Sequence, residues 1–118
     1  MATGTPGPAA QNVTYMRIVE DVTGSVITQT ELAQAVGTST RTVQNWTRGS
    51  APRGKVAVRL LDIQHVVGEL RDVYNDEAIQ IWLRSRNRNL GGQRPLELLA
   101  AERVEEVITE VQNIVRGM

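Results

Sequence analysis

The chain has 118 residues, with 13 Lys and Arg, 13 Asp and Glu, one His and no Cys. This length suits one domain, or two very small helical units that share a core. Without cysteine, neither a disulfide framework nor a thiolate metal site can form, and we expect no bound cofactor. The apolar runs are far shorter than the roughly 20 residues of a membrane-spanning helix, so we expect a cytoplasmic protein with no membrane partner.

The first 12 residues are rich in Gly, Pro and Ala, a composition that predicts a disordered tail. They have neither the basic cluster nor the apolar core of a signal peptide. Apolar residues at helical spacing then predict a first helix over residues 13–22, which ends near Gly24.

Two short helices around a tight turn are predicted next. Thr28 stands three residues before Glu31, as in a capping box, and Gly37 ends the helix that starts there. Ser39 is a suitable cap for the following helix, which Gly49 closes.

The rest of the chain also has apolar residues at helical spacing. We expect a long helix over residues 56–71, a helix capped by Asn75 or Asp76, and an amphipathic last helix from Val104. The paired glycines within residues 87–95 break the pattern, and the proline that ends this stretch suits the first turn of another helix. No strand is predicted, so the fold class is all-α.

Charge is distributed unevenly along the chain, although its net value is zero. Between Glu31 and Asp62 there are five Lys and Arg residues and no acid, a balance of +5. Residues 96–118 hold five Glu against two Arg, a balance of −3. The average therefore hides two surfaces that we expect to have different partners.

The two short helices fit a helix-turn-helix. Such a motif needs a tiny residue where the helices cross and a turn that tolerates a left-handed backbone, and Ala33 and Gly37 meet these needs. The inward faces need apolar residues, which are Leu32, Val36, Val43 and Trp46.

The outward side chains of this motif are hydrogen-bonding and include no carboxylate. Arg41, Gln44 and Asn45 are candidate readers of base edges in a major groove, although the sequence does not say which amide is the main reader. Residues before and after them, with Arg59, are expected nearer to phosphates. The alternative is an ordinary solvated helix pair. The expected contacts to double-stranded operator DNA are Gln29, Thr30, Ser39, Thr40, Arg41, Gln44, Asn45, Arg48, Arg53 and Lys55.

Two motifs carry a resemblance to known families. The pattern of Gln29, Ala33, Gly37, Val43 and Trp46 resembles the Xre group of bacterial regulators over residues 28–50. Further along, a Trp-Leu pair, an Asn three residues before Leu-Gly-Gly, and Pro-Leu-Glu-Leu-Leu resemble the C-terminal domain of the Xre/MbcA/ParS antitoxins. The matching residues are Trp82, Leu83, Asn87, Leu90, Gly91, Gly92, Pro95, Leu96, Glu97, Leu98 and Leu99.

Together the motifs extend the resemblance to about residues 14–116. One departure lies at Ala100 to Arg103, where relatives often have a Gly before the last helix. The resemblance implies a tail over residues 1–12, a helix-turn-helix domain over 13–71 and a small helical toxin-binding domain over 72–118.

The resemblance implies the antitoxin of a type II toxin-antitoxin system. Such a protein binds and neutralises a RES-domain toxin that degrades NAD, and it represses its own operon by binding the operator. Its C-terminal end is expected to reach toward the toxin's active site, and a homodimer or a larger hetero-oligomer with toxin is expected. The implied toxin-binding residues are Trp82, Asn87, Leu90, Gly91, Gly92, Arg94, Pro95, Arg116, Gly117 and Met118.

Alternatives remain open for the second half. The Leu-Gly-Gly loop can be a mere connection between helices, and Trp82 can be a core residue. The apolar stripe of the last helix can pack on the domain or dimerise, and Glu105, Glu106 and Glu110 can be its solvated face. The alternative function is a stand-alone transcriptional regulator whose C-terminal half only dimerises.

The sequence predicts no catalytic activity. His65 lies among apolar neighbours in a predicted helix, without a nucleophile and an orienting acid arranged around it, although Glu69 is placed to pair with it. No phosphate-binding loop and no HExxH metal motif occurs in the chain.

Overall fold

The computed structural model describes residues 8–117, with side chains from Val13 onward. This part of the chain forms helices and no strand, as the sequence predicts, and none of its helices is long and apolar enough to cross a membrane. The elements are α1 (Pro8–Ser25), α2 (Gln29–Val36), α3 (Thr40–Trp46), α4 (Gly54–Arg71), α5 (Asp76–Arg84), the short 3-10 helix η1 (Arg88–Leu90), α6 (Pro95–Ala100) and α7 (Val104–Gly117).

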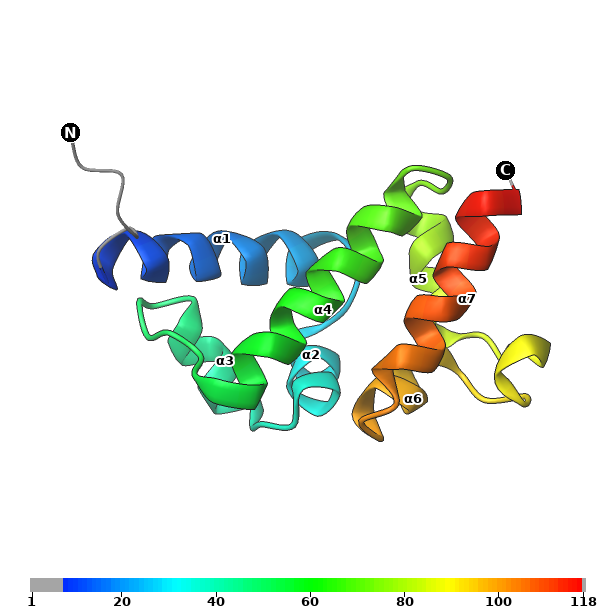
Figure 1. Ribbon diagram of the computed structural model, residues 1–118. Coiled ribbons are helices and arrows are strands. Elements are labelled where there is room, and N and C mark those ends of the chain that lie inside the picture. Colours follow the sequence, from blue (N-terminus) through cyan, green and yellow to red (C-terminus); the bar gives the residue numbers. More distant parts are fainter. Residues whose placement is uncertain (1–7, 118) are drawn as a thin grey trace.

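The long helix α4 runs between the two halves of the molecule (Figure 1). On one side lie α1, α2 and α3, and on the other lie α5, α6 and α7. Helix α4 packs against α1, α2, α5 and α7, and α2 also packs against α6. As a result, α3 and the C-terminal end of α7 lie on opposite sides of α4.

Helix α1 starts earlier than the sequence predicts. It begins at Pro8, so residues 8–12 of the expected tail are helical, whereas residues 1–7 lie outside the described residues. Proline suits the first turn of a helix and alanine is the strongest helix former, so the same composition also permits a helix. Helix α3 ends earlier than the sequence predicts. It ends at Trp46, and Gly49 adopts a left-handed backbone in the loop that follows.

The predicted caps are confirmed. The Thr28 hydroxyl accepts a 3.0 Å bond from the amide of Glu31, whose carboxylate accepts a 2.8 Å bond from the Thr28 amide. Ser39 caps α3 and Asn75 caps α5 through their side-chain oxygens. Gly37 ends α2 at a φ of 83°, which favours glycine, and a Cβ there would lie 2.8 Å from the Arg59 guanidinium and displace it.

One apolar core extends through both halves. Trp46 of α3, Leu60 and Leu70 of α4, and Val107 of α7 are all at most 2% exposed and belong to the same cluster. The apolar stripe of α7 therefore packs mainly within the chain, with Val107 and Val111 buried and Ile108, Ile114 and Val115 partly buried.

A partly buried ion pair also joins the two halves. Arg84, at the end of α5, donates to both carboxylate oxygens of Glu31, at 2.6 and 2.9 Å. Burial raises the pKa of the Glu31 carboxyl, but hydrogen bonds from Arg84 and Thr28 and the Arg84 charge outweigh it, so this pKa lies below its ordinary value of 4.5. The acid that caps the second helix is thus neutralised by the second half of the chain.

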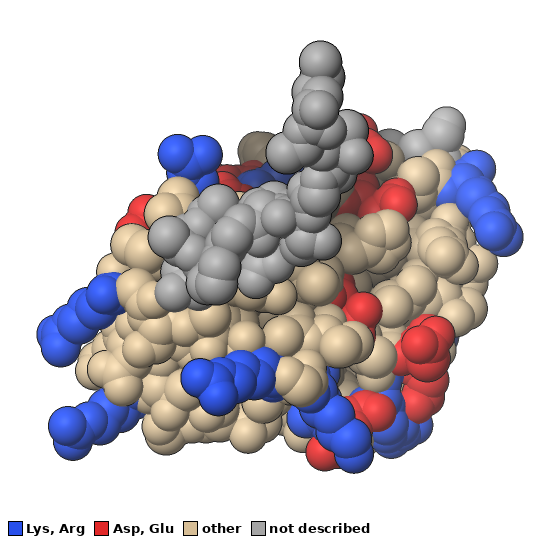
Figure 2. Space-filling model, turned by 60° about the vertical axis from the view of Figure 1, so that its left-hand side comes forward, with Lys and Arg blue, Asp and Glu red and all other residues tan. Residues whose placement is uncertain are grey.

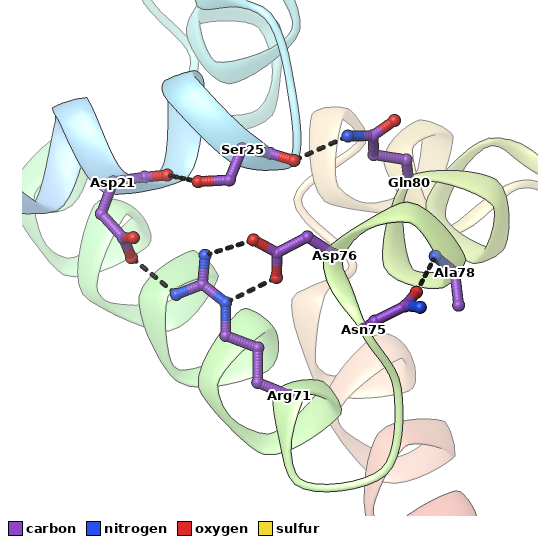
Figure 3. A network of polar contacts seen from close by, with 7 residues as sticks. All are labelled: Asp21, Ser25, Arg71, Asn75, Asp76, Ala78 and Gln80. Carbon is purple, nitrogen blue, oxygen red and sulfur yellow. Dashed lines mark hydrogen bonds and ion pairs between the residues drawn. The ribbon is translucent and has the colours of Figure 1, made fainter.

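Arg71 makes a second link, between α1 and α5 (Figure 3). Its guanidinium donates to Asp21 at 2.7 Å and to Asp76 at 2.9 and 3.3 Å. Close by, the Gln80 amide donates a 2.6 Å bond to the carbonyl of Ser25. Hydrogen bonds to Asp21 and Asp76 raise the pKa of Arg71.

A third link joins Arg59 of α4 to the loop before α7. Arg59 Nη2 lies 2.6 Å from Glu102 Oε1, and Nη1 donates a 3.4 Å bond to the Val36 carbonyl. Among the described residues, Glu102 is the only one other than glycine with a positive φ, 64°. The left-handed turn therefore lies in the stretch where the resemblance leads us to expect a Gly. Arg59, which was expected nearer to phosphates, is already engaged within the chain.

We predict that Glu31→Gln lowers the free energy of unfolding at pH 7 by about 1–2 kcal/mol, because Arg84 loses its anionic acceptor, whereas the amide oxygen of Gln can keep the capping bond. The folded-state pKa of Glu31 is depressed, so its contribution is present above pH 4.5 and is lost as pH falls through the folded-state value. Urea denaturation at several pH values should show the difference from wild type shrinking below pH 4.5.

Glu20→Gln is the matched control, since Glu20 is exposed on α1. A deficit of Glu31→Gln that stayed constant from neutral to acid pH would contradict the role given to the ionised carboxylate.

Candidate functional site

Helices α2 and α3 have the packing of a helix-turn-helix. Ala33 is 2% exposed, and the predicted inward residues Leu32, Val36, Val43 and Trp46 are all at most 2% exposed. Burial of Val43 and Trp46 fixes how α3 is turned about its axis, and so places its polar side chains outward.

The side chains that the sequence selects as base readers are exposed. Arg41, Gln44 and Asn45 lie on the outer side of α3, and Arg48 follows its end. Within residues 8–117, none of the four side chains is held in an ion pair, so their charge and amide groups face solvent. Side chains of this kind can bond to base edges in a major groove.

Two predicted contact residues also serve the motif itself. Ser39 accepts a 3.1 Å bond from a backbone amide of α3, and the Thr40 hydroxyl donates a 3.3 Å bond to that of Thr30. The second bond ties the amino end of α3 to the first turn of α2, which also carries Gln29. These polar groups therefore hold the two helix starts together on one face.

Arg53 and Lys55 add positive charge at the start of α4, and both are exposed. Figure 2 brings the left-hand side of Figure 1 forward, and on its left and lower left Lys and Arg side chains project singly from the surface. Asp and Glu gather mainly toward the right of that view. This uneven distribution agrees with the basic first half that the sequence indicates.

The loop between α5 and α6 is closed by its own hydrogen bonds. The Asn87 amide donates a 3.1 Å bond to the Gln93 carbonyl, and the Asn87 side chain accepts a 2.9 Å bond from the Asn89 amide. Gly91 and Gly92 have φ values of 68° and 80°, which favour glycine. The asparagine and both glycines are therefore needed by the turn itself.

Other members of the expected toxin-binding set also have structural contacts. Arg94 donates to the Arg84 carbonyl at 3.0 Å and pairs with Glu97 at 2.7 Å. Leu90 and Pro95 are buried, and Trp82 is half-buried against the core.

The exposed members of that set are few. Gly91 lies at the tip of the loop, and Arg116 and Gly117 at the end of α7. Met118 lies outside the described residues.

Sequence reasoning missed a groove beside the first half of α7, with a volume of about 550 Å³. Asn89, Glu105, Glu106 and Glu110 line it, among others. Glu110 is only 6% exposed and accepts a 2.9 Å bond from Asn89, so placing it on the solvated face was wrong. The available signal was its position three residues after Val107, at the edge of the apolar stripe.

His65 is about half exposed on α4, and its ring lies 3.6 Å from the Glu69 carboxylate, as the sequence suggests. Across the described residues no group of three or more His, Cys, Asp and Glu side chains is arranged to hold a metal ion.

Comparison with known proteins gives matches to both halves. The model of the antitoxin Xre/MbcA/ParS C-terminal toxin-binding domain matches residues 64–116, and a helix-turn-helix model matches residues 27–63. A chain in the crystal structure of the M. tuberculosis MbcT-MbcA toxin-antitoxin complex has the same fold, with a TM-score of 0.73, 24% identity, and coverage of 87% of this chain and 95% of that chain.

Curated relatives match over most of their length. A probable mycobacterial cidal antitoxin of Mycobacterium tuberculosis is 33% identical over 91 residues, which cover 77% of this chain and 78% of the relative. The mycobacterial cidal antitoxin MbcA of Mycobacterium bovis is 26% identical over 93 residues, which cover 78% of this chain and 82% of the relative. With a helix-turn-helix, the toxin-binding domain model and these relatives in one order along the chain, the protein belongs to the Xre/MbcA/ParS family of antitoxins.

Proposed function

We propose that this antitoxin binds and neutralises a RES-domain toxin that degrades NAD, and that it represses the shared operon by binding operator DNA. The observation that carries the proposal is the separation of two surfaces on one body. The polar outer face of α3 and the end of α7 lie on opposite sides of α4. A single chain can then offer one surface to DNA and another to a protein.

Neutralisation requires binding alone, since an inhibitor that occupies or covers an active site performs no chemistry. The exposed end of α7, with Arg116 and Gly117, is the part of the second half best placed to enter a cleft. Gly91 at the tip of the preceding loop is also exposed. The chain with the similar fold belongs to a toxin-antitoxin complex, and this supports a toxin as the partner.

Operator binding follows from the outer face of the helix-turn-helix. Arg41, Gln44 and Asn45 would read base edges, while Lys55 and Arg53 would contact phosphates and set the register. Helix-turn-helix proteins generally read paired half-sites, so we propose a twofold homodimer that forms a larger hetero-oligomer with the toxin.

The alternative, a stand-alone regulator whose second half only dimerises, has less support. The apolar stripe of α7 packs into the core of its own chain, with Val107 and Val111 at most 2% exposed. Most of this stripe is therefore already used within the chain, although Ile108, Ile114 and Val115 are only partly buried.

The first prediction concerns the toxin's activity. We expect that the protein encoded beside this antitoxin depletes cellular NAD when expressed alone, and that co-expression of the antitoxin restores NAD. Arg41→Ala is the matched control, because it alters the DNA surface and should protect fully. Unchanged NAD on expression of the neighbour would contradict the assignment of toxin class, and NAD loss despite the antitoxin would contradict neutralisation.

A second prediction separates base reading from phosphate contact. Arg41→Ala should reduce discrimination between operator and random DNA by about 1–3 kcal/mol, because a base contact is lost. Lys55→Ala should weaken binding to operator DNA and to random DNA by the same factor. It should also reduce the slope of log K against log salt by roughly 0.9, the value for one phosphate contact. Fluorescence anisotropy titrations over a range of salt give both quantities, and wild-type behaviour of both variants would make the motif structural only.

A third prediction addresses the C-terminal end. Deletion of residues 116–118 should impair neutralisation in cells while leaving the melting temperature close to that of the full chain, because Arg116 and Gly117 are exposed. Full protection by this truncated chain would exclude the end of α7 from the inhibitory contact.

A further inference from the structure

Beyond Lys55 at its amino end, the outer face of α4 is not used by the functions proposed above. Its inward residues are buried, but Val58, Leu61, His65, Gly68 and Asp72 form a second stripe at spacings of three and four. Val58 is 59% exposed and Leu61 44% exposed. A stripe with this spacing is the arrangement by which one helix packs against another.

Gly68 lies in the middle of α4 without a local reason for being glycine. Its φ is not positive, and an added Cβ would meet nothing within 4 Å. Glycine inside a helix is less favourable than alanine, so this residue does not stabilise α4 itself. The missing side chain of Gly68 leaves a hollow in the helix surface. This hollow is part of a groove of about 410 Å³ that Leu61, His65 and Glu69 also line.

Charge is polarised along the same helix. Arg53 and Lys55 lie at its amino end, Asp62 lies at its middle, and Glu69 and Asp72 lie at its carboxyl end. Arg59 and Arg71, the other cations of α4, are already paired within the chain. A second α4 running in the opposite direction would bring unlike charges together, whereas a parallel one would bring like charges together.

We propose that the outer face of α4 binds the same face of a second copy of this chain in antiparallel orientation. The twofold axis then passes beside His65, and each Leu61 fills the hollow at Gly68 of the other copy. The contact is self-complementary, as a twofold interface must be. It uses none of the exposed residues of α3 and none at the end of α7.

The test is the oligomeric state of the full chain without toxin. By sedimentation equilibrium, wild type is expected to be a dimer at micromolar concentration. Gly68→Leu and Leu61→Glu should each weaken self-association about tenfold or more, because a packed interface accepts neither added volume nor an unpaired charge. Ile81→Glu is the control, since Ile81 is 61% exposed on α5, away from the stripe.

Cross-linking tests the geometry separately from stability. The chain has no cysteine, so any disulfide must form through the one cysteine that is introduced. His65→Cys should form a disulfide-linked dimer on mild oxidation, because residue 65 faces its own copy across the axis, whereas Ile81→Cys should remain monomeric. A monomeric wild type, a dimer unaffected by Gly68→Leu and Leu61→Glu, or loss of toxin binding in these variants without any change in self-association would overturn the proposal.

Discussion

The buried face of α4 is the constraint on which the rest of the structure depends. Both halves bury apolar side chains in one cluster with Leu60, Leu70 and their neighbours. Apolar burial alone does not specify the orientation of the packed helices. Arg71 and Arg59 add ion pairs that help to fix how α1, α5 and the loop before α7 lie along α4. The two proposed binding surfaces are thereby held on one body.

The ion pairs between the halves also decide where free charge remains. Glu31, the acid within the helix-turn-helix, is neutralised by Arg84 of the second half, and Glu102 meets Arg59. The cations of α3 and of the following loop keep no such partner within residues 8–117. The second half thus helps to leave a basic face on the first, which is what an operator-binding surface needs.

The parts predictable from sequence are those set by local chemistry. The caps at Thr28 and Ser39 and the left-handed turn at Gly37 depend on neighbours within a few residues, and they were predicted correctly. The pairing of Glu31 with Arg84 joins residues 53 positions apart, and the burial of Glu110 depends on the packing of Asn89, so neither follows from spacing along the chain. Contact with toxin or DNA depends on surfaces outside this chain and stays a prediction.

The central claim is that toxin and DNA use different surfaces, and hydrogen exchange measured by mass spectrometry tests it most directly. Exchange would be followed in the full antitoxin alone, with its toxin, and with operator DNA. The account predicts that toxin slows exchange in residues 87–117 and that DNA slows it in residues 28–55. Protection of the same segment by both partners would contradict the account.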